Sequence, residues 1–163
     1  MPMILLDTRI DAPIETVFDL SRNIDAHVES TPGTREKAVA GRTTGLIELG
    51  ETVTWEARHF GIRQRLTSKI TEFTYPIYFV DEMVDGIFEM IRHEHHFESS
   101  DGGTLMRDKF EFRAPLGILG RIAERLFLTR YLEKFLIQRN SILKEMAESA
   151  HSEEPDTSTD TGS

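Results

Sequence analysis

The hydrophobic and polar positions of this chain follow two different periods, which divide it into a strand-rich centre and helical ends. Through residues 52–113 apolar residues recur mostly at every second position, as in strands with one face on a core. Through residues 118–147 they recur at every third or fourth position, which predicts a long amphipathic helix. At about 1.5 Å per residue, such a helix is long enough to cross the whole domain.

Shorter elements are predicted before the central region. Residues 3–10 are apolar-rich and favour a strand. Asp11-Ala12-Pro13 then suits the start of a helix, because proline is well placed in a first helical turn. Residues 23–30 indicate a second short helix, which Thr31-Pro32-Gly33-Thr34 ends.

The central region predicts a series of antiparallel strands. The expected strands cover residues 53–59, 62–71, 77–85, 87–98 and 105–113. The clearest hairpin signal is Ser99-Ser100-Asp101-Gly102-Gly103. Phe88 and Met90 break the alternation of their strand, so we expect a β-bulge near Gly86 or Ile87. Consecutive hairpins make a meander, and the long helix can cover its concave face.

Composition adds a domain boundary and several exclusions. The tail 149–163 is rich in small, polar and acidic residues, which predicts a disordered segment after a domain at 1–148. The net charge is −9, and the tail's four acidic residues leave −5 for the domain, which argues against nucleic-acid binding. The absence of cysteine excludes disulfides and thiolate zinc sites. With no signal peptide or membrane-spanning segment apparent, we expect a cytoplasmic protein without stable membrane insertion.

Several polar residues share the predicted apolar face of the sheet. His93 and His95 precede Phe97 on one strand face, and Asp108 lies between Met106 and Phe110. The hairpin at residues 99–103 should place His95 opposite Asp108. The turn at Gly86 should bring His93 near Asp81.

Three interpretations of this set remain open. The residues form buried pairs, in which carboxylates satisfy the imidazoles. Alternatively, they form the polar end of a ligand cavity and orient a hydroxyl, carbonyl or carboxylate. A third role is general acid–base catalysis by His93, His95 and Asp108. The candidate ligand-binding residues are Trp55, His59, Phe79, Asp81, His93, His95, Phe97, Asp108, Phe110 and Phe112.

His93-Glu94-His95-His96 also raises the question of a metal, because a His-x-His pair can chelate from one strand face. The downstream spacing of acidic residues and glycine does not match a cupin metal motif, and the sequence has no His-Glu-x-x-His motif. The sequence therefore predicts neither a bound metal nor a cofactor.

Four segments of the chain match a known protein family: Ile10-Asp11-Ala12-Pro13 with Val17-Phe18, Phe79-Val80-Asp81-Glu82-Met83 with Gly86, His93-Glu94-His95-His96-Phe97, and Phe112 with Pro115-Leu116-Gly117. On these segments, the chain resembles the START/Bet v 1-like (SRPBCC) superfamily, near its polyketide cyclase/dehydrase-like branch. The resemblance covers about residues 3–147. It implies an α+β helix-grip fold: a curved antiparallel sheet of six or seven strands, two short helices after the first strand, and a long C-terminal helix.

The resemblance also implies a cavity for an apolar or amphipathic molecule of lipid, quinone or polyketide type. Our primary hypothesis is therefore a binding or carrier protein rather than an enzyme. The alternatives are a cyclase or dehydratase that uses the His and Asp residues, and a module that interacts with a partner protein or a membrane through its helix. No catalytic role carries over by position.

Overall fold

The computed structural model describes residues 2–154 and contains seven strands and a set of helices around them. In chain order the elements are β1 (Met3–Ile10), α1 (Ile14–Ser21), α2 (Ile24–Ser30), a 3₁₀ turn (Pro32–Thr34), β2 (Lys37–Gly41), β3 (Thr52–His59), β4 (Ile62–Thr74), β5 (Tyr78–Asp85), β6 (Met90–Ser100), β7 (Gly103–Arg113), α3 (Gly117–Ala123), a π-helical turn (Glu124–Leu128) and α4 (Thr129–Glu153).

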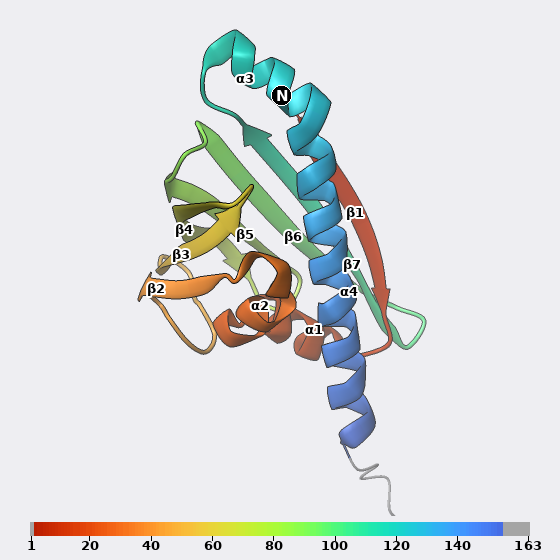
Figure 1. Cartoon of the computed structure of the whole chain (residues 1–163). Coiled ribbons are helices and arrows are strands. Elements are labelled where there is room, and N and C mark those ends of the chain that lie inside the picture. The colour runs from red at the N-terminus through yellow and green to blue at the C-terminus, as the bar shows by residue number, and fades with distance from the viewer. Residues whose placement is uncertain (1, 155–163) are drawn as a thin grey trace, which may run out of the picture.

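The strands form one antiparallel sheet in the order β1-β7-β6-β5-β4-β3-β2. Strands β2 to β7 follow one another as a meander, and β1 pairs with β7 at the far edge. The sheet curves around α4, which runs along its concave side, while α1 and α2 close one end (Figure 1). This is the helix-grip fold, with the predicted order of strand, two short helices, meander and long helix.

The register of the central strands agrees with the sequence prediction. His95 lies opposite Asp108 across β6 and β7, and Asp81 lies opposite His93 across β5 and β6. Alternate residues of β7, namely Met106, Asp108, Phe110 and Phe112, are buried. The period of two therefore identified correctly which side chains of β7 face the core.

Aromatic side chains anchor α1 to the sheet. The Phe18 ring is fully buried and makes edge-to-face contacts with four aromatic rings at centroid distances of 5.1–5.4 Å. These rings belong to Phe73, Tyr75, Phe79 and Phe97. Aromatic pairs in this geometry contribute about 0.5–1.5 kcal/mol each beyond their buried area, so Phe18 fixes the closed end of the sheet.

The structure corrects two strand predictions. β6 begins at Met90 rather than at residue 87, and residues 86–89 form the turn from β5, so β6 has no bulge at residue 86 or 87; a register shift instead occurs in the β4–β5 pairing, between Met83 and Asp85. Phe88 breaks the alternation because it belongs to this turn. Strand β2 was missed because Lys37–Gly41 is a short edge strand with mostly exposed residues, and its sequence has no clear alternation.

The predicted helix 118–147 is divided by the π-helical turn into α3 and α4. The apolar stripe does not all face the sheet: Leu119, Ile122, Leu126 and Phe127 are at least half exposed, because α3 and the turn lie beyond the end of the sheet (Figure 1). Arg139 is a charged residue of this helix, but it is only 3% exposed and faces the core.

Helix α4 continues to Glu153, five residues beyond the predicted domain boundary at 148. The rest of the predicted tail, residues 155–163, lies outside the described residues. No helix within residues 2–154 combines the length and apolarity needed to cross a membrane.

Candidate functional site

A cavity of about 170 Å³ lies between the concave face of the sheet and α4. Its walls are mostly apolar, with side chains from β3, β4, β5, β6, β7 and α4; they include Val53, Trp55, Leu66, Ile70, Phe79, Ile91, Phe110, Leu132, Phe135 and Leu136. Polar side chains reach the cavity from two separate groups. Small-molecule sites are commonly built in this way, with an apolar body and a few placed polar groups.

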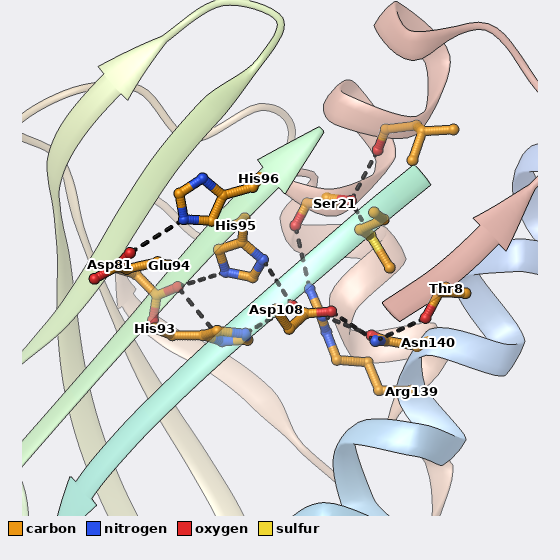
Figure 2. A network of polar contacts seen from close by, with 12 residues as sticks. Thr8, Ser21, Asp81, His93, Glu94, His95, His96, Asp108, Arg139 and Asn140 are labelled. Atoms are coloured by element: carbon orange, nitrogen blue, oxygen red, sulfur yellow. Dashed lines mark hydrogen bonds and ion pairs between the residues drawn. The ribbon is translucent and has the colours of Figure 1, made fainter. Parts of the chain in front are cut away.

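The first polar group is a four-residue network of two histidines and two aspartates (Figure 2). His93 Nε2 donates to Asp108 Oδ1 at 2.8 Å, and His95 Nε2 donates to Asp81 Oδ2 at 2.9 Å. The two imidazole rings pack against each other with centroids 3.8 Å apart. Each ring also faces the other carboxylate: His95 Nδ1 lies 3.2 Å from Asp108 Oδ1, and His93 Nδ1 lies 3.9 Å from Asp81 Oδ2.

Two side chains of α4, those of Asn140 and Arg139, hold Asp108 in position. Asn140 Nδ2 donates to Asp108 Oδ2 at 2.7 Å and lies 3.3 Å from Thr8 Oγ1 on β1. Arg139 Nη1 lies 4.0 Å from Asp108 Oδ1, and Arg139 Nη2 donates to the Ser21 carbonyl at 3.4 Å. Asp108 is completely buried as a side chain. The network therefore joins β1, β5, β6, β7, α1 and α4 in one polar centre.

Burial and charge set the protonation of this network. Burial opposes charge on Asp108 and Asp81, but the two histidines outweigh it and lower the pKa of both carboxyls, that of Asp108 strongly. Burial and the neighbouring His95 lower the pKa of His93. Burial also opposes charge on His95, but Asp108 and Asp81 outweigh it and raise its pKa. Relative to their ordinary behaviour, the two carboxyls and His95 therefore favour the charged form, and His93 favours the neutral form.

The second polar group lies where α2, β3 and α4 approach the cavity. His27 Nε2 lies 3.2 Å from Glu36 Oε2, and the His27 ring stacks on Trp55 at a centroid distance of 4.2 Å. His59 Nδ1 lies 2.6 Å from the Tyr131 hydroxyl. Burial opposes charge on Glu36, but His27 outweighs it and lowers the pKa of that carboxyl.

The structure brings most of the predicted ligand-binding residues to the cavity wall. Trp55, His59, Phe79, Asp81, His93, His95 and Phe110 line the cavity. Three others do not line it: Phe97 packs against Phe18 and Phe79, Phe112 belongs to the core beside Ile4 and Leu136, and Asp108 lies behind the histidines.

Sequence analysis missed several residues of the site, chiefly His27, Glu36, Arg139 and Asn140. For Arg139 and Asn140 a signal was present. Arg139 and Asn140 lie three and four residues after Leu136, and four and three residues before Leu143. At this helical spacing, they share the inner face of the helix with these two leucines. For His27 and Glu36 there was no such signal, because His27 lies on the short helix α2 and Glu36 in the loop before β2, and only the fold brings them together.

Residues 10–136 match the family model described as polyketide cyclase/dehydrase and lipid transport. Among solved structures, the chain is similar to the protein TTHA0849 from Thermus thermophilus, with a TM-score of 0.75, 16% identity, and coverage of 91% of this chain and 99% of the other. It is also similar to a START superfamily protein from Mycobacterium smegmatis (TM-score 0.69, 12% identity, 91% and 98% covered).

A third similar structure is the major latex-like protein 151 of ginseng, Panax ginseng (TM-score 0.67, 13% identity, 90% and 97% covered). These identities are low, so the structural similarities establish the fold alone. A comparison with curated proteins found no match.

Proposed function

This chain belongs to the polyketide cyclase/dehydrase and lipid transport family, and from that premise we propose that it binds a small amphipathic molecule in its internal cavity. The observation that supports the proposal is the cavity itself: its walls are mostly apolar, and one wall is made by the polar residues His93, His95, Asp81 and Arg139. Burial of apolar surface supplies affinity, and the polar wall orients the ligand.

The polar wall favours a head group that accepts hydrogen bonds. Arg139 lines the cavity, and its buried Nε–H has no hydrogen-bond partner within residues 2–154. A buried donor without a partner is costly, so a ligand oxygen that accepts from it would remove that cost. A carboxylate, a phenolate or a polarised carbonyl therefore fits this wall better than an ammonium group.

The volume limits the size of the ligand in this closed form. An apolar protein cavity of about 150 Å³ holds a benzene molecule, and this cavity is of similar size, at about 170 Å³. The part of the ligand that lies inside the cavity is therefore compact, with one or two rings or a short chain. A longer ligand extends beyond the cavity.

The first test is native mass spectrometry of protein purified from its own host, with extraction and identification of the bound molecule. In parallel, the melting temperature is measured with 2-naphthoate, 2-naphthol and naphthalene, which share one ring system. We expect 2-naphthoate to stabilise the protein most. The absence of a copurified molecule, together with no shift for any of the three probes, would contradict the proposal.

Arg139→Met tests the polar wall. We expect the variant to lose the advantage of 2-naphthoate over naphthalene while retaining the shift with naphthalene, since the apolar walls are unchanged. A damaged fold would reduce the melting-temperature shift with both probes, whereas loss of the head-group contact would reduce only the shift with 2-naphthoate. His96→Gln is the matched control, because His96 is on the outer face of β6.

Acid–base chemistry is a second candidate function, which one observation favours. Burial and His95 lower the pKa of His93, whereas Asp108 and Asp81 raise the pKa of His95, and both rings line the cavity. Such a pair offers a base and an acid to the same ligand. Mass spectrometry of the extracted ligand after incubation with the protein tests this. Conversion by the native chain that is lost in a folded His95→Leu variant supports chemistry, and an unchanged ligand rules it out.

A further inference from the structure

The geometry points to a divalent transition-metal site formed by Asp81, His93 and His95 on the cavity wall. This inference is independent of the proposed ligand, because it rests on the donor atoms alone. One donor atom from each of the three residues lies within 4.8 Å of the others.

The three donors converge on one side of the imidazole pair. His95 Nε2 is 2.9 Å and His93 Nδ1 is 3.9 Å from the same oxygen, Asp81 Oδ2. In a site with metal–ligand bonds of about 2.0–2.1 Å, neighbouring donor atoms are about 3 Å apart. Small side-chain rotations therefore suffice, because His93 and His95 already occupy one face of β6 and Asp81 the adjoining strand.

In each imidazole ring, the nitrogen that does not face Asp81 is directed at the carboxylate of Asp108, which both rings share. Asp108 Oδ1 lies 2.8 Å from His93 Nε2 and 3.2 Å from His95 Nδ1. Metal-binding histidines usually direct their second nitrogen to a carboxylate or carbonyl, which fixes the tautomer and the ring orientation. Asn140 in turn holds Asp108 through its other oxygen. The contacts of Asp108 and Asn140 would orient both rings so that His93 Nδ1 and His95 Nε2 are the atoms that bind the metal.

Burial decides which side of the ring pair takes the metal. The Asp108 side chain has no exposed surface, and Asn140 and Arg139 already contact it, so no room remains there for further ligands. Asp81 is 27% exposed as a side chain and lines the cavity. A metal on the Asp81 side would have three protein ligands on one face and open positions toward the cavity.

The donor types narrow the class of metal. Two imidazoles and one carboxylate suit Zn²⁺, Fe²⁺ or Co²⁺ better than Mg²⁺ or Ca²⁺, which prefer oxygen ligands alone. Open coordination positions are typical of sites that bind a substrate oxygen or a water rather than of structural sites. An oxygen of a cavity ligand could complete the coordination.

The test is titration of the chelator-treated full chain with Co²⁺ and Zn²⁺, followed by visible absorption for Co²⁺ and by melting temperature and elemental analysis for Zn²⁺. We expect one equivalent per chain, a Co²⁺ spectrum typical of nitrogen and oxygen ligands, and a raised melting temperature. No saturable binding by the native chain would overturn the inference, whatever the variants do.

Variants locate the site. Asp81→Asn and His93→Gln should each abolish stoichiometric binding, whereas His96→Gln should leave it unchanged. Glu36→Gln is a second control, because it alters the other His–carboxylate pair of the cavity. Binding lost in Glu36→Gln but kept in Asp81→Asn would place the metal elsewhere and refute the assignment. Since none of these readouts uses an organic ligand, they distinguish failure of the metal site from failure of the proposed function.

Discussion

At the scale of single residues, Asp108 is the central group of the polar network. It contacts both histidines and Asn140 and has no exposed side-chain surface. A buried ion pair costs desolvation energy when it forms, but removal of one partner leaves the other charge uncompensated. The stability of the domain should therefore depend strongly on this one carboxylate.

We predict that Asp108→Asn lowers the free energy of unfolding by about 3 kcal/mol, because His95 then loses one of its two carboxylates. Urea denaturation measures this. Asp7→Asn is the matched control on the neighbouring strand, since Asp7 pairs with Arg107 at the surface with 61% of its side chain exposed. We expect the control to change stability by less than about 0.5 kcal/mol. Equal effects of the two variants would show that the network has no special role.

Glu36 should contribute to the pH dependence of stability. Its pKa is held below the ordinary value of 4.5 by His27, so the folded chain favours the carboxylate more than the unfolded chain does. This contribution is complete above pH 4.5 and is lost as the pH falls through the lowered pKa. The stability difference between the native chain and Glu36→Gln should therefore shrink below pH 4.5.

Chemical denaturation at a series of pH values checks this. Glu48→Gln, at a side chain that is 68% exposed, serves as the control. A difference that stays constant down to the acid transition would show that His27 does not hold Glu36 in its charged form.

At the scale of elements, the start of the C-terminal helical region depends on two close contacts. Glu124, in the π-helical turn, is buried and accepts a hydrogen bond from the Ala114 amide at the end of β7. Gly120 of α3 lies against the Pro115 backbone, where a Cβ atom would collide with the carbonyl oxygen. These contacts turn the chain from the last strand into the helix.

Gly120→Ala should lower the free energy of unfolding by about 1–3 kcal/mol, because the added methyl group must displace backbone. Gly33→Ala is the control, since a Cβ there meets no atom within 4 Å. Thermal and urea denaturation compare the two variants. If Gly120→Ala proves as stable as the control, the 114–120 turn has enough freedom to accommodate the methyl group.

At the scale of the whole molecule, the cavity is a gap in the core that the curved sheet and α4 leave between them. A packed protein interior contains few voids larger than a water molecule. A cavity of about 170 Å³ therefore reduces stability unless a ligand fills it.

Ser68→Phe tests this. Ser68 is buried on β4 and lines the cavity. The ring should fill the space, change the free energy of unfolding by less than about 1 kcal/mol and abolish the melting-temperature shift with 2-naphthoate. If side chains already fill the space beside Ser68, the added ring should instead lower the free energy of unfolding by about 1–3 kcal/mol. Lys69→Phe, on the exposed face of the same strand, is the control and should keep the shift.

The sequence by itself determined the architecture and much of the polar network. A side-chain period of two fixed the inner face of β7, and two hairpin signals set the register that pairs His95 with Asp108 and His93 with Asp81. These features are local, because a strand's faces and a tight turn depend on residues close together in the chain.

Only the tertiary structure decided how the site is completed. The placement of Arg139 and Asn140 beside the histidine–aspartate network depends on how α4 is rotated against β1 and β7, and the pairing of His27 with Glu36 joins α2 to the loop before β2. The same packing leaves the apolar residues of α3 exposed, because the helix begins beyond the end of the sheet. Hydrophobic periodicity shows which face of a helix or strand is apolar, but only tertiary packing decides which residues, or solvent, that face contacts.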